Sequence, residues 1–325
     1  MTAKTHSYLF HGLKLTISGQ DAILAALKRR LGHFPPANPE APSDLRFEFH
    51  PTADASRHGV RRPTVPGRMV LELPGGQVLY LEASRQLYID LAGCARMLCD
   101  TQTGEVCVSY LESEASNAGL LSHPLFIIPL SELLKRRGLY MVHAAGLSLD
   151  GKGLLVAGAS GAGKTTLTIA LLRAGFGFLG DDTAFLCTRS QGLRVLAFPD
   201  EIDITPHTAS FFPELQDFAR RPSPAGRPKQ SLISTRVYSA RPTWECAPAV
   251  LVFPQIAQVH ESVLRPMPKD AAFVELLCNV VRTDVGSAQA HLDALAALVA
   301  QCLCFRLETG RDFDALPALL RSVLV

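Results

Sequence analysis

The spacing of apolar residues divides the chain into a strand-rich first part and a second part in which strands and helices alternate. In the first part, apolar residues alternate with polar ones, or run together, over segments of strand length. This pattern predicts strands at 46–50, 69–73, 77–83, 86–91 and 105–111. Pro74-Gly75-Gly76 separates two of these segments and predicts a hairpin turn. One helix is expected at 21–31, where Ile23, Leu24, Leu27 and Leu31 recur at helical spacing.

The pattern of predicted strands and helices changes near residue 116. A helix is predicted at 129–137, ended by Gly138. Beyond it, strands are predicted at 153–157, 177–180, 184–188, 195–198, 249–253 and 302–307, and helices at 164–174, 269–281, 288–300 and 312–323. Short buried strands that alternate with helices are typical of an α/β layer fold. We therefore expect a smaller β-rich α+β domain over residues 1–115 and an α/β domain over residues 116–325.

Composition and charge narrow the class of protein. The chain has 325 residues, which is long enough for two domains, and 47% of them are hydrophobic, which excludes an intrinsically disordered chain. The net charge of +2 gives no electrostatic reason to expect binding to nucleic acid or to a membrane surface. No apolar run reaches the ~20 residues of a membrane span, and the start has no signal-peptide core. We therefore expect a cytoplasmic protein.

The cysteines are predicted to belong to the core. There are eight, mostly inside apolar runs, and no CxxC pair occurs among them. In a reducing compartment such residues are small buried hydrophobes. Cys302 and Cys304 share one face of a predicted strand, but the two further ligands that a metal site needs are not nearby in the sequence.

A glycine-rich segment between the strand 153–157 and the helix 164–174 matches the phosphate-binding pattern GxxxxGK[ST]. Its residues are Gly158, Ala159, Ser160, Gly161, Ala162, Gly163, Lys164 and Thr165, followed by Thr166 in the first helical turn. In such a loop the backbone N–H groups and the helix N-terminus bind phosphate oxygens. Lys164 can reach the β- and γ-phosphates, and the Thr165 hydroxyl can bind Mg²⁺. The competing GxSxG hydrolase motif, with Ser160 as nucleophile, fails because residue 162 is Ala.

Two carboxylates follow the next predicted strand. Asp181 and Asp182 come directly after Gly180, and the connection from the loop strand is a single helix. Parallel strands joined in this way end at the same edge of a sheet, so we expect both carboxylates beside the phosphate loop. One can hold the metal ion while the other accepts a proton from an attacking hydroxyl. The alternative is a turn that carries solvated acidic residues.

A histidine precedes the loop strand. On residue pattern alone, a lone His near an apolar segment, such as His143, is more often packed in a core than catalytic.

The three motifs together resemble a known family. His143-Ala144-Ala145-Gly146, the loop 158–165 and Gly180-Asp181-Asp182 are similar, in order and spacing, to the catalytic domain of HPr kinase/phosphorylase. PEP carboxykinase, a structural relative of that family, similarly has a P-loop followed by paired aspartates. The resemblance covers about residues 138–188 and implies an α/β P-loop domain of the HPr kinase/PEP carboxykinase type.

The resemblance implies transfer of a phosphoryl group from ATP with Mg²⁺, or alternatively from pyrophosphate, to a hydroxyl that is typically a serine. By position, Asp181 resembles the general base, Asp182 the metal-linked partner and His143 the active-site histidine. The family's Glu-led, glycine-rich signature is absent, since Asp200-Glu201 lacks the glycines, and the first part has no counterpart. The resemblance therefore does not extend to HPr as the acceptor or to the reverse reaction, and both stay open.

The basic segment 220–229 has two interpretations. It is either a solvated connector or a lid whose Arg227 or Lys229 closes on phosphates.

The sequence thus predicts a cytoplasmic Mg²⁺- and ATP-dependent kinase that acts on a serine of a peptide or protein. The alternatives are a kinase for a small molecule such as a sugar or an amino acid, and a nucleotide-dependent switch or binding module. The resemblance also suggests a homo-oligomer.

Overall fold

The computed structural model describes residues 3–57, 59–115, 117–220, 229–233, 237–238, 243–277, 280 and 283–324. The chain forms two compact units, one of Met1–Leu139 with Val281–Ala290 and one of Tyr140–Val280 with His291–Val325. Each combines helices with a large multi-stranded sheet, so the fold is mixed α/β. Among the described helices, none has the length and apolar character that crossing a membrane requires.

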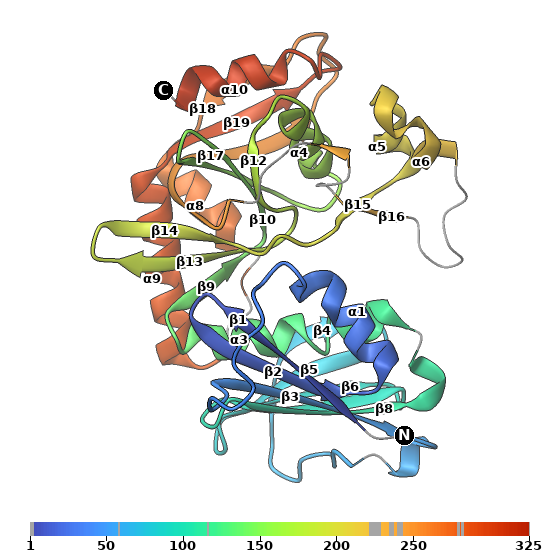
Figure 1. Cartoon of the computed structure of the whole chain (residues 1–325). Helices are drawn as coiled ribbons and strands as arrows, with labels where there is room; N and C mark the ends of the chain where they lie inside the picture. Colours follow the sequence, from blue (N-terminus) through green and yellow to red (C-terminus); the bar gives the residue numbers. More distant parts are fainter. Residues whose placement is uncertain are drawn as a thin grey trace. The chain divides into compact units, whose positions relative to one another are not determined.

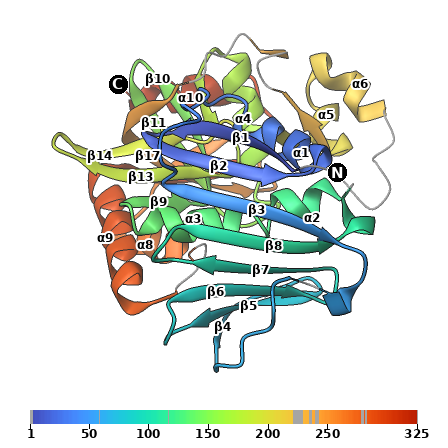
Figure 2. The same cartoon turned by 60° about the horizontal axis from the view of Figure 1, so that its bottom comes forward.

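The first unit is built on an eight-stranded sheet. The strands lie in the order β1-β2-β3-β8-β7-β6-β5-β4, as Figure 2 shows. Most neighbours are antiparallel, but β3 is parallel to both β2 and β8. The predicted hairpin is confirmed, because β4 and β5 pair across Gly75. The strand bounds are β1 (Lys4–Phe10), β2 (Leu13–Gly19), β3 (Leu45–Thr52), β4 (Arg68–Leu73), β5 (Gly76–Leu81), β6 (Gln86–Leu91), β7 (Ala95–Asp100) and β8 (Glu105–Leu111).

The helices of the first unit include residues that the sequence analysis placed in the second domain. The helix α1 (Asp21–Leu31) has the predicted bounds and buries its apolar stripe. The helices α2 (Ala118–Ser122) and α3 (Ile127–Lys135) also belong here. The ring of Phe126, just before α3, lies 5.0 Å from that of Phe47 on β3. Because this contact joins α3 to the first sheet, the boundary falls at Leu139 and not at residue 115. Two short 3₁₀ turns complete the unit, η1 (Ala55–Arg57) and η2 (Glu112–Glu114).

A buried ionic cluster ties a late segment of the chain to the first unit. The carboxylate of Glu132 on α3 is paired with Lys135, at 2.8 Å between Nζ and Oε2, and with Arg136. The Thr283 hydroxyl donates to Glu132 Oε1 at 2.9 Å. Arg136 Nη2 lies 2.5 Å from Asp284 Oδ2. These bonds hold residues 283 and 284 against α3, although about 150 residues of chain separate them.

The second unit contains a nine-stranded sheet. Its main path runs β12-β10-β11-β17-β14-β13-β9, while β19 pairs with β17 and β18. The strand β17 is parallel to two of its neighbours, β11 and β19. The strand bounds are β9 (Leu139–Val142), β10 (Ala144–Leu149), β11 (Lys152–Ala157), β12 (Gly177–Gly180), β13 (Ala184–Arg189), β14 (Gly192–Ala197), β17 (Glu245–Ile256), β18 (Val263–Pro266) and β19 (Leu303–Thr309). The short strands β15 (Ile202–Ile204) and β16 (Gln230–Leu232) pair separately.

Helices cover both faces of this sheet, as the alternation along β17 shows. Val250 and Val252 pack in one cluster with α4 (Lys164–Arg173) and α10 (Leu316–Leu324). Leu251 and Phe253 pack in another with α8 (Lys269–Leu277) and the later turns of α9 (Val285–Gln301). The expected α/β layers are therefore present. Figure 1 labels these elements, together with α5 (Pro206–Ser210) and α6 (Gln216–Arg220), between which η3 (Pro213–Leu215) lies.

Some predicted boundaries shift for identifiable reasons. The helix expected from residue 312 begins at Leu316, because Asp312 instead accepts hydrogen bonds from Ser262 N at 2.9 and 3.0 Å. The helix predicted at 269–281 is described up to Leu277, and residues 278, 279 and 281 lie outside the described residues. The seven described cysteines are free thiols, and Cys302 and Cys304 are buried as predicted. Cys278 lies outside the described residues.

Replacing Glu132 by Ala tests the ionic cluster. The substitution leaves Lys135, whose side chain is 4% exposed, without its carboxylate, while Arg136 keeps Asp284. An uncompensated buried charge costs about 3–5 kcal/mol. We expect the free energy of unfolding, measured by urea denaturation, to fall by that amount. The control is Glu72→Ala, at an exposed position of β4, which should change it by less than about 0.5 kcal/mol. Equal effects of the two substitutions would contradict a structural role for the cluster.

Candidate active site

Three predicted motifs meet at one edge of the second sheet. The strand β10 runs antiparallel between β11 and β12, so its start lies at the same edge as the ends of those two strands. Ala144 pairs with Ala157, which places His143 beside Gly158. Gly146 pairs with Gly180, which places Asp181 and Asp182 on the other side of β10. The strand β10 lies between the loop strand β11 and the strand β12 that precedes the aspartates, and it carries the histidine to the site.

The glycine-rich loop has the curled backbone that its sequence predicted. Gly158, Gly161 and Gly163 have φ angles of 148°, 83° and 101°, which residues with a side chain rarely adopt. Gly163 caps the start of α4, and Ala159 and Ser160 are exposed. The loop therefore presents its backbone at the N-terminus of a ten-residue helix.

Lys164 is buried beneath this loop. Its Nζ donates to the carbonyl oxygens of Gly158, at 2.9 Å, and Ala159, at 3.3 Å. Burial lowers the pKa of Lys164, and the charges of Asp182 and Asp181 oppose that shift. The lysine is therefore held at the loop by neutral carbonyl groups and remains near two carboxylates.

Asp181 is a buried carboxyl that is only partly satisfied. Its side chain is 3% exposed, and the Thr165 hydroxyl donates to Oδ2 at 3.3 Å. Its other oxygen, Oδ1, is buried and has no hydrogen-bond partner among the described residues. Burial, with a smaller contribution from Asp182, raises the pKa of Asp181 to about 7.

Two backbone and side-chain features hold Asp181 in place. A Cβ on the preceding Gly180 would lie 2.5 Å from Thr183 O and 2.7 Å from Phe198 O, so a side chain does not fit there. The buried Thr168, which was not singled out from the sequence, donates its hydroxyl to Lys164 O at 3.0 Å and lowers the pKa of Asp181. Its spacing of three residues from Thr165 puts both hydroxyls on one face of α4, a signal that could have revealed it.

An oxygen-rich site of this kind fits a hard divalent cation. The Thr165 hydroxyl and the unpartnered Asp181 oxygen are ligand types that Mg²⁺ prefers. No group of three or more His, Cys, Asp or Glu side chains arranged for a metal occurs in the described part of the chain. A magnesium ion here would therefore take most of its remaining ligands from phosphates and water, as is usual for Mg²⁺ in phosphoryl-transfer sites.

Asp182 and His143 form the accessible side of the site. Asp182 is exposed, whereas His143 is half-buried and its ring is hydrogen-bonded to the main chain of Asp182. Burial lowers the pKa of His143, and the Asp182 charge opposes this, so the ring is neutral at pH 7. Thr166 is half-buried in the first turn of α4.

The end of the basic segment lies close enough to the site for its charge to affect the ionisable groups there. Lys229, directly before β16, is exposed, and its positive charge lowers the pKa values of His143, Lys164 and Asp181. Arg227, the other residue considered for a lid, lies outside the described residues, as do all of residues 221–228. Sequence spacing alone could not place Lys229, because the pairing of β15 with β16 brings it there.

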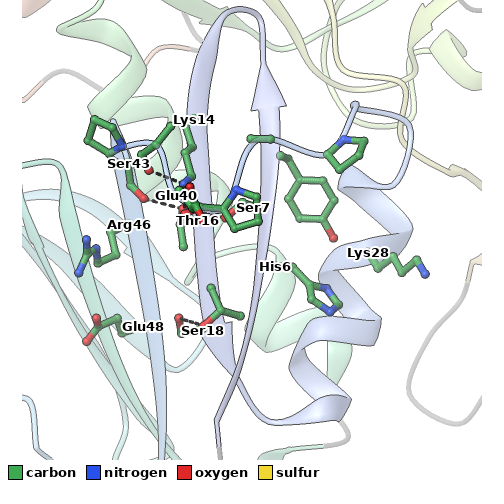
Figure 3. A pocket seen from close by; sticks show the side chains of 17 residues that line it. His6, Ser7, Lys14, Thr16, Ser18, Lys28, Glu40, Ser43, Arg46 and Glu48 are labelled. Carbon is green, nitrogen blue, oxygen red and sulfur yellow. Dashed lines mark hydrogen bonds between the residues drawn. The ribbon is translucent and has the colours of Figure 1, made fainter.

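The first unit has a groove of its own, with a volume of about 800 Å³, between β1, β2, β3 and residues 36–43 (Figure 3). The hydroxyls of Thr16 and Ser43 lie 2.6 Å apart, and Lys14 Nζ donates to Pro39 O at 2.8 Å. These polar groups bond to one another and hold the loop against the sheet. None of the predicted site residues lines the groove.

Comparisons with known proteins give little information about the function. No protein-family model matches the chain, and no curated protein matches it. Among solved structures, the chain is similar to that of the Hpr(Ser) kinase/phosphatase from Coxiella burnetii, with 15% identity and a TM-score of 0.29, over 56% of this chain and 92% of that one. Because a similarity this weak carries no functional argument, the function has to be argued from the site.

The raised pKa of Asp181 predicts how stability depends on pH without divalent cations. The folded state holds the Asp181 proton up to a pKa of about 7, whereas an unfolded Asp loses it near pH ~4. Between these values the folded state binds more protons, so the free energy of unfolding falls as pH rises, by up to about 1.4 kcal/mol per pH unit.

The test measures unfolding between pH 5 and 7 in EDTA. Asp181→Asn should lack this component of the slope, while Asp203→Asn, at an exposed position of β15, should keep the wild-type slope. Identical pH profiles for wild type and Asp181→Asn would show that Asp181 is ionised throughout.

Proposed function

We propose that the chain is a Mg²⁺- and ATP-dependent phosphotransferase whose acceptor is a hydroxyl, a serine in a peptide or protein. The observation that carries the proposal is the meeting of four groups at one sheet edge: the glycine-rich loop with Lys164, the Thr165–Asp181 pair, the exposed Asp182 and His143. Phosphoryl transfer asks a protein mainly for positioning and charge neutralisation, and these groups can supply both.

The donor side of the reaction belongs to the loop and to α4. The backbone N–H groups of residues 158–166 and the N-terminus of α4 would bind the ATP phosphates. Lys164 would exchange its bonds with the carbonyls of Gly158 and Ala159 for bonds to the β- and γ-phosphates. Thr165 and Asp181 would hold Mg²⁺, which, when bound, neutralises phosphate charge.

The two aspartates differ in burial, and this difference favours another assignment of the base and the metal ligand than the one expected from the sequence. Position in the family motif assigned the base to Asp181 and the metal to Asp182. However, Asp181 is almost inaccessible and bonded to the hydroxyl expected to bind the metal, whereas Asp182 is exposed. A pKa of about 7 is that of a buried carboxyl without its cation, and a bound divalent ion would lower it.

We therefore assign proton acceptance to Asp182. The acceptor oxygen would attack the γ-phosphorus as its proton passes to the Asp182 carboxylate, and ADP would leave. His143, neutral and bonded to the main chain of Asp182, would fix the position of that residue and of the incoming hydroxyl. Lys229, next to these groups, is placed to attract the phosphates.

Transfer of label from γ-labelled ATP to a fractionated extract of the source cells tests the proposal. We expect wild type, with Mg²⁺, to label a peptide or protein. Lys164→Ala should abolish labelling, because the phosphates lose their cation. Asp182→Asn should lower the rate by about 10²–10⁴-fold, the usual contribution of a general base, while ATP affinity changes little. Asp203→Asn is the control and should retain the wild-type rate.

The outcomes separate the alternatives. Wild-type transfer by a folded Asp182→Asn protein would contradict the assignment of the base. Label found only in small molecules would show a metabolite kinase, and tight ATP binding with no label on any acceptor would support a nucleotide-dependent switch.

A further inference from the structure

An exposed apolar side chain stands where the glycine-rich loop meets the neighbouring strand. Ile256 is the last residue of β17 and is 69% exposed. The strands β11 and β17 are parallel neighbours, and β17 continues past the end of β11 to Ile256. A Cβ on Gly163 would lie 3.7 Å from Ile256 Cγ1. Single exposed aliphatic residues are common on proteins, so the position of Ile256 beside the loop is what calls for an explanation.

The order of the strands indicates in which direction along the sheet edge a bound nucleotide would extend. On one side of β11 lie β10 and β12 with the two aspartates, and on the other side lie β17 and β19. The groups proposed for the metal and the γ-phosphate, Thr165 and Asp181, are on the β12 side. An extended nucleoside triphosphate held by its terminal phosphate there directs its nucleoside toward the ends of β17 and β19. Ile256 stands at that end.

A second observation at the same place points to a polar partner. Thr309 ends β19 and pairs in register with Ile256. Both residues lie on the face of the sheet that packs against α4, because Val252 and Leu307, four and two residues earlier, belong to that cluster. Thr309 is 8% exposed, and its hydroxyl is buried with no hydrogen-bond partner among the described residues.

The loop after β17 is held in place without a ligand. Ala257 N donates to Thr309 O at 3.2 Å, and Gly310 N donates to Ser262 Oγ at 3.0 Å. Asp312 accepts from Ser262 N at 2.9 Å. These bonds fix the segment that directly follows Ile256. A surface fixed in advance loses little freedom on binding.

We infer that Ile256 is the surface on which the nucleoside of a bound nucleoside triphosphate rests, with the hydroxyl of Thr309, its register partner on β19, as a polar partner. This inference rests on the proposed function and names the part of the site that binds the base and sugar. Ile256 contributes apolar area to one side of the nucleoside, and the glycine-rich loop binds the phosphates independently.

The test compares the binding of Mg²⁺–ATP and Mg²⁺–tripolyphosphate by calorimetry, because only ATP has a nucleoside. Ile256→Ser should weaken ATP binding roughly tenfold, since it removes most of the apolar surface, and should leave tripolyphosphate binding within about twofold. The matched control is Leu303→Ser, a 56% exposed aliphatic residue at the opposite end of β19, which should change neither. Ile256→Phe should bind ATP at least as tightly as wild type, and it carries the test if the Ser variant does not fold.

The two proposals fail in different ways. If Ile256→Ser weakens both ligands equally, or leaves ATP binding unchanged, the inference is overturned and the proposed function stands. If the wild-type protein binds neither ligand, the proposed function is overturned, and the inference with it.

Discussion

The candidate site depends on a carboxyl group that is buried against the first turn of α4. Removing a carboxylate from water is costly unless hydrogen bonds or a cation compensate it. The Thr165 hydroxyl of α4 provides part of that compensation for Asp181, while one oxygen keeps no partner among the described residues. The fold therefore holds an incompletely satisfied acidic group beside the glycine-rich loop. A divalent cation between phosphates and protein would satisfy it.

The position of that carboxyl follows from close backbone packing. Gly180 has no room for a side chain between Thr183 and Phe198, and a Cβ on Gly146 of β10 would lie 3.0 Å from the Cβ of Leu179. These glycines allow β12, β10 and their neighbours to pack tightly at one edge. The strand β10 begins directly after His143 and thereby brings a third motif to the same edge. Three segments that are separate in the sequence become one site through this arrangement of strands.

Strongly patterned elements could be predicted from the sequence. The helix α1 and the strands β6, β8 and β12 have the predicted bounds because their apolar residues follow a clear period or run. The strand β10 was missed, since its small residues, Ala144 to Gly146, give no alternation and are buried on both faces. The strands β1 and β2 were also missed. One face of β2 carries Lys14, Thr16 and Ser18, which bond to neighbouring polar groups and obscure the apolar alternation.

Features of the fold that depend on long-range contacts could not be predicted from the sequence. Local pattern identified a helix near residues 129–137, but only the contact of Phe126 with Phe47 reveals which sheet it covers. The tie between Glu132 and Thr283 is equally invisible in the sequence.

At the site, motif spacing located Lys164, Thr165, Asp181 and Asp182. The order of the two aspartates could not reveal that one is buried and the other exposed, because burial depends on how Gly180 packs. Lys229 and Ile256 reach the site only through strand pairing.

We propose that the loop, Thr165 and Asp181 form one Mg²⁺–nucleotide site. The most direct measurement is an experimental structure with Mg²⁺ and a non-hydrolysable ATP analogue. The account predicts phosphates on the amides of residues 158–165, and the ion bound to Thr165 Oγ1 at about 2.1 Å with Asp181 as a direct or water-mediated ligand. A nucleotide bound elsewhere, or an ion held by Asp182 without Asp181, would contradict it.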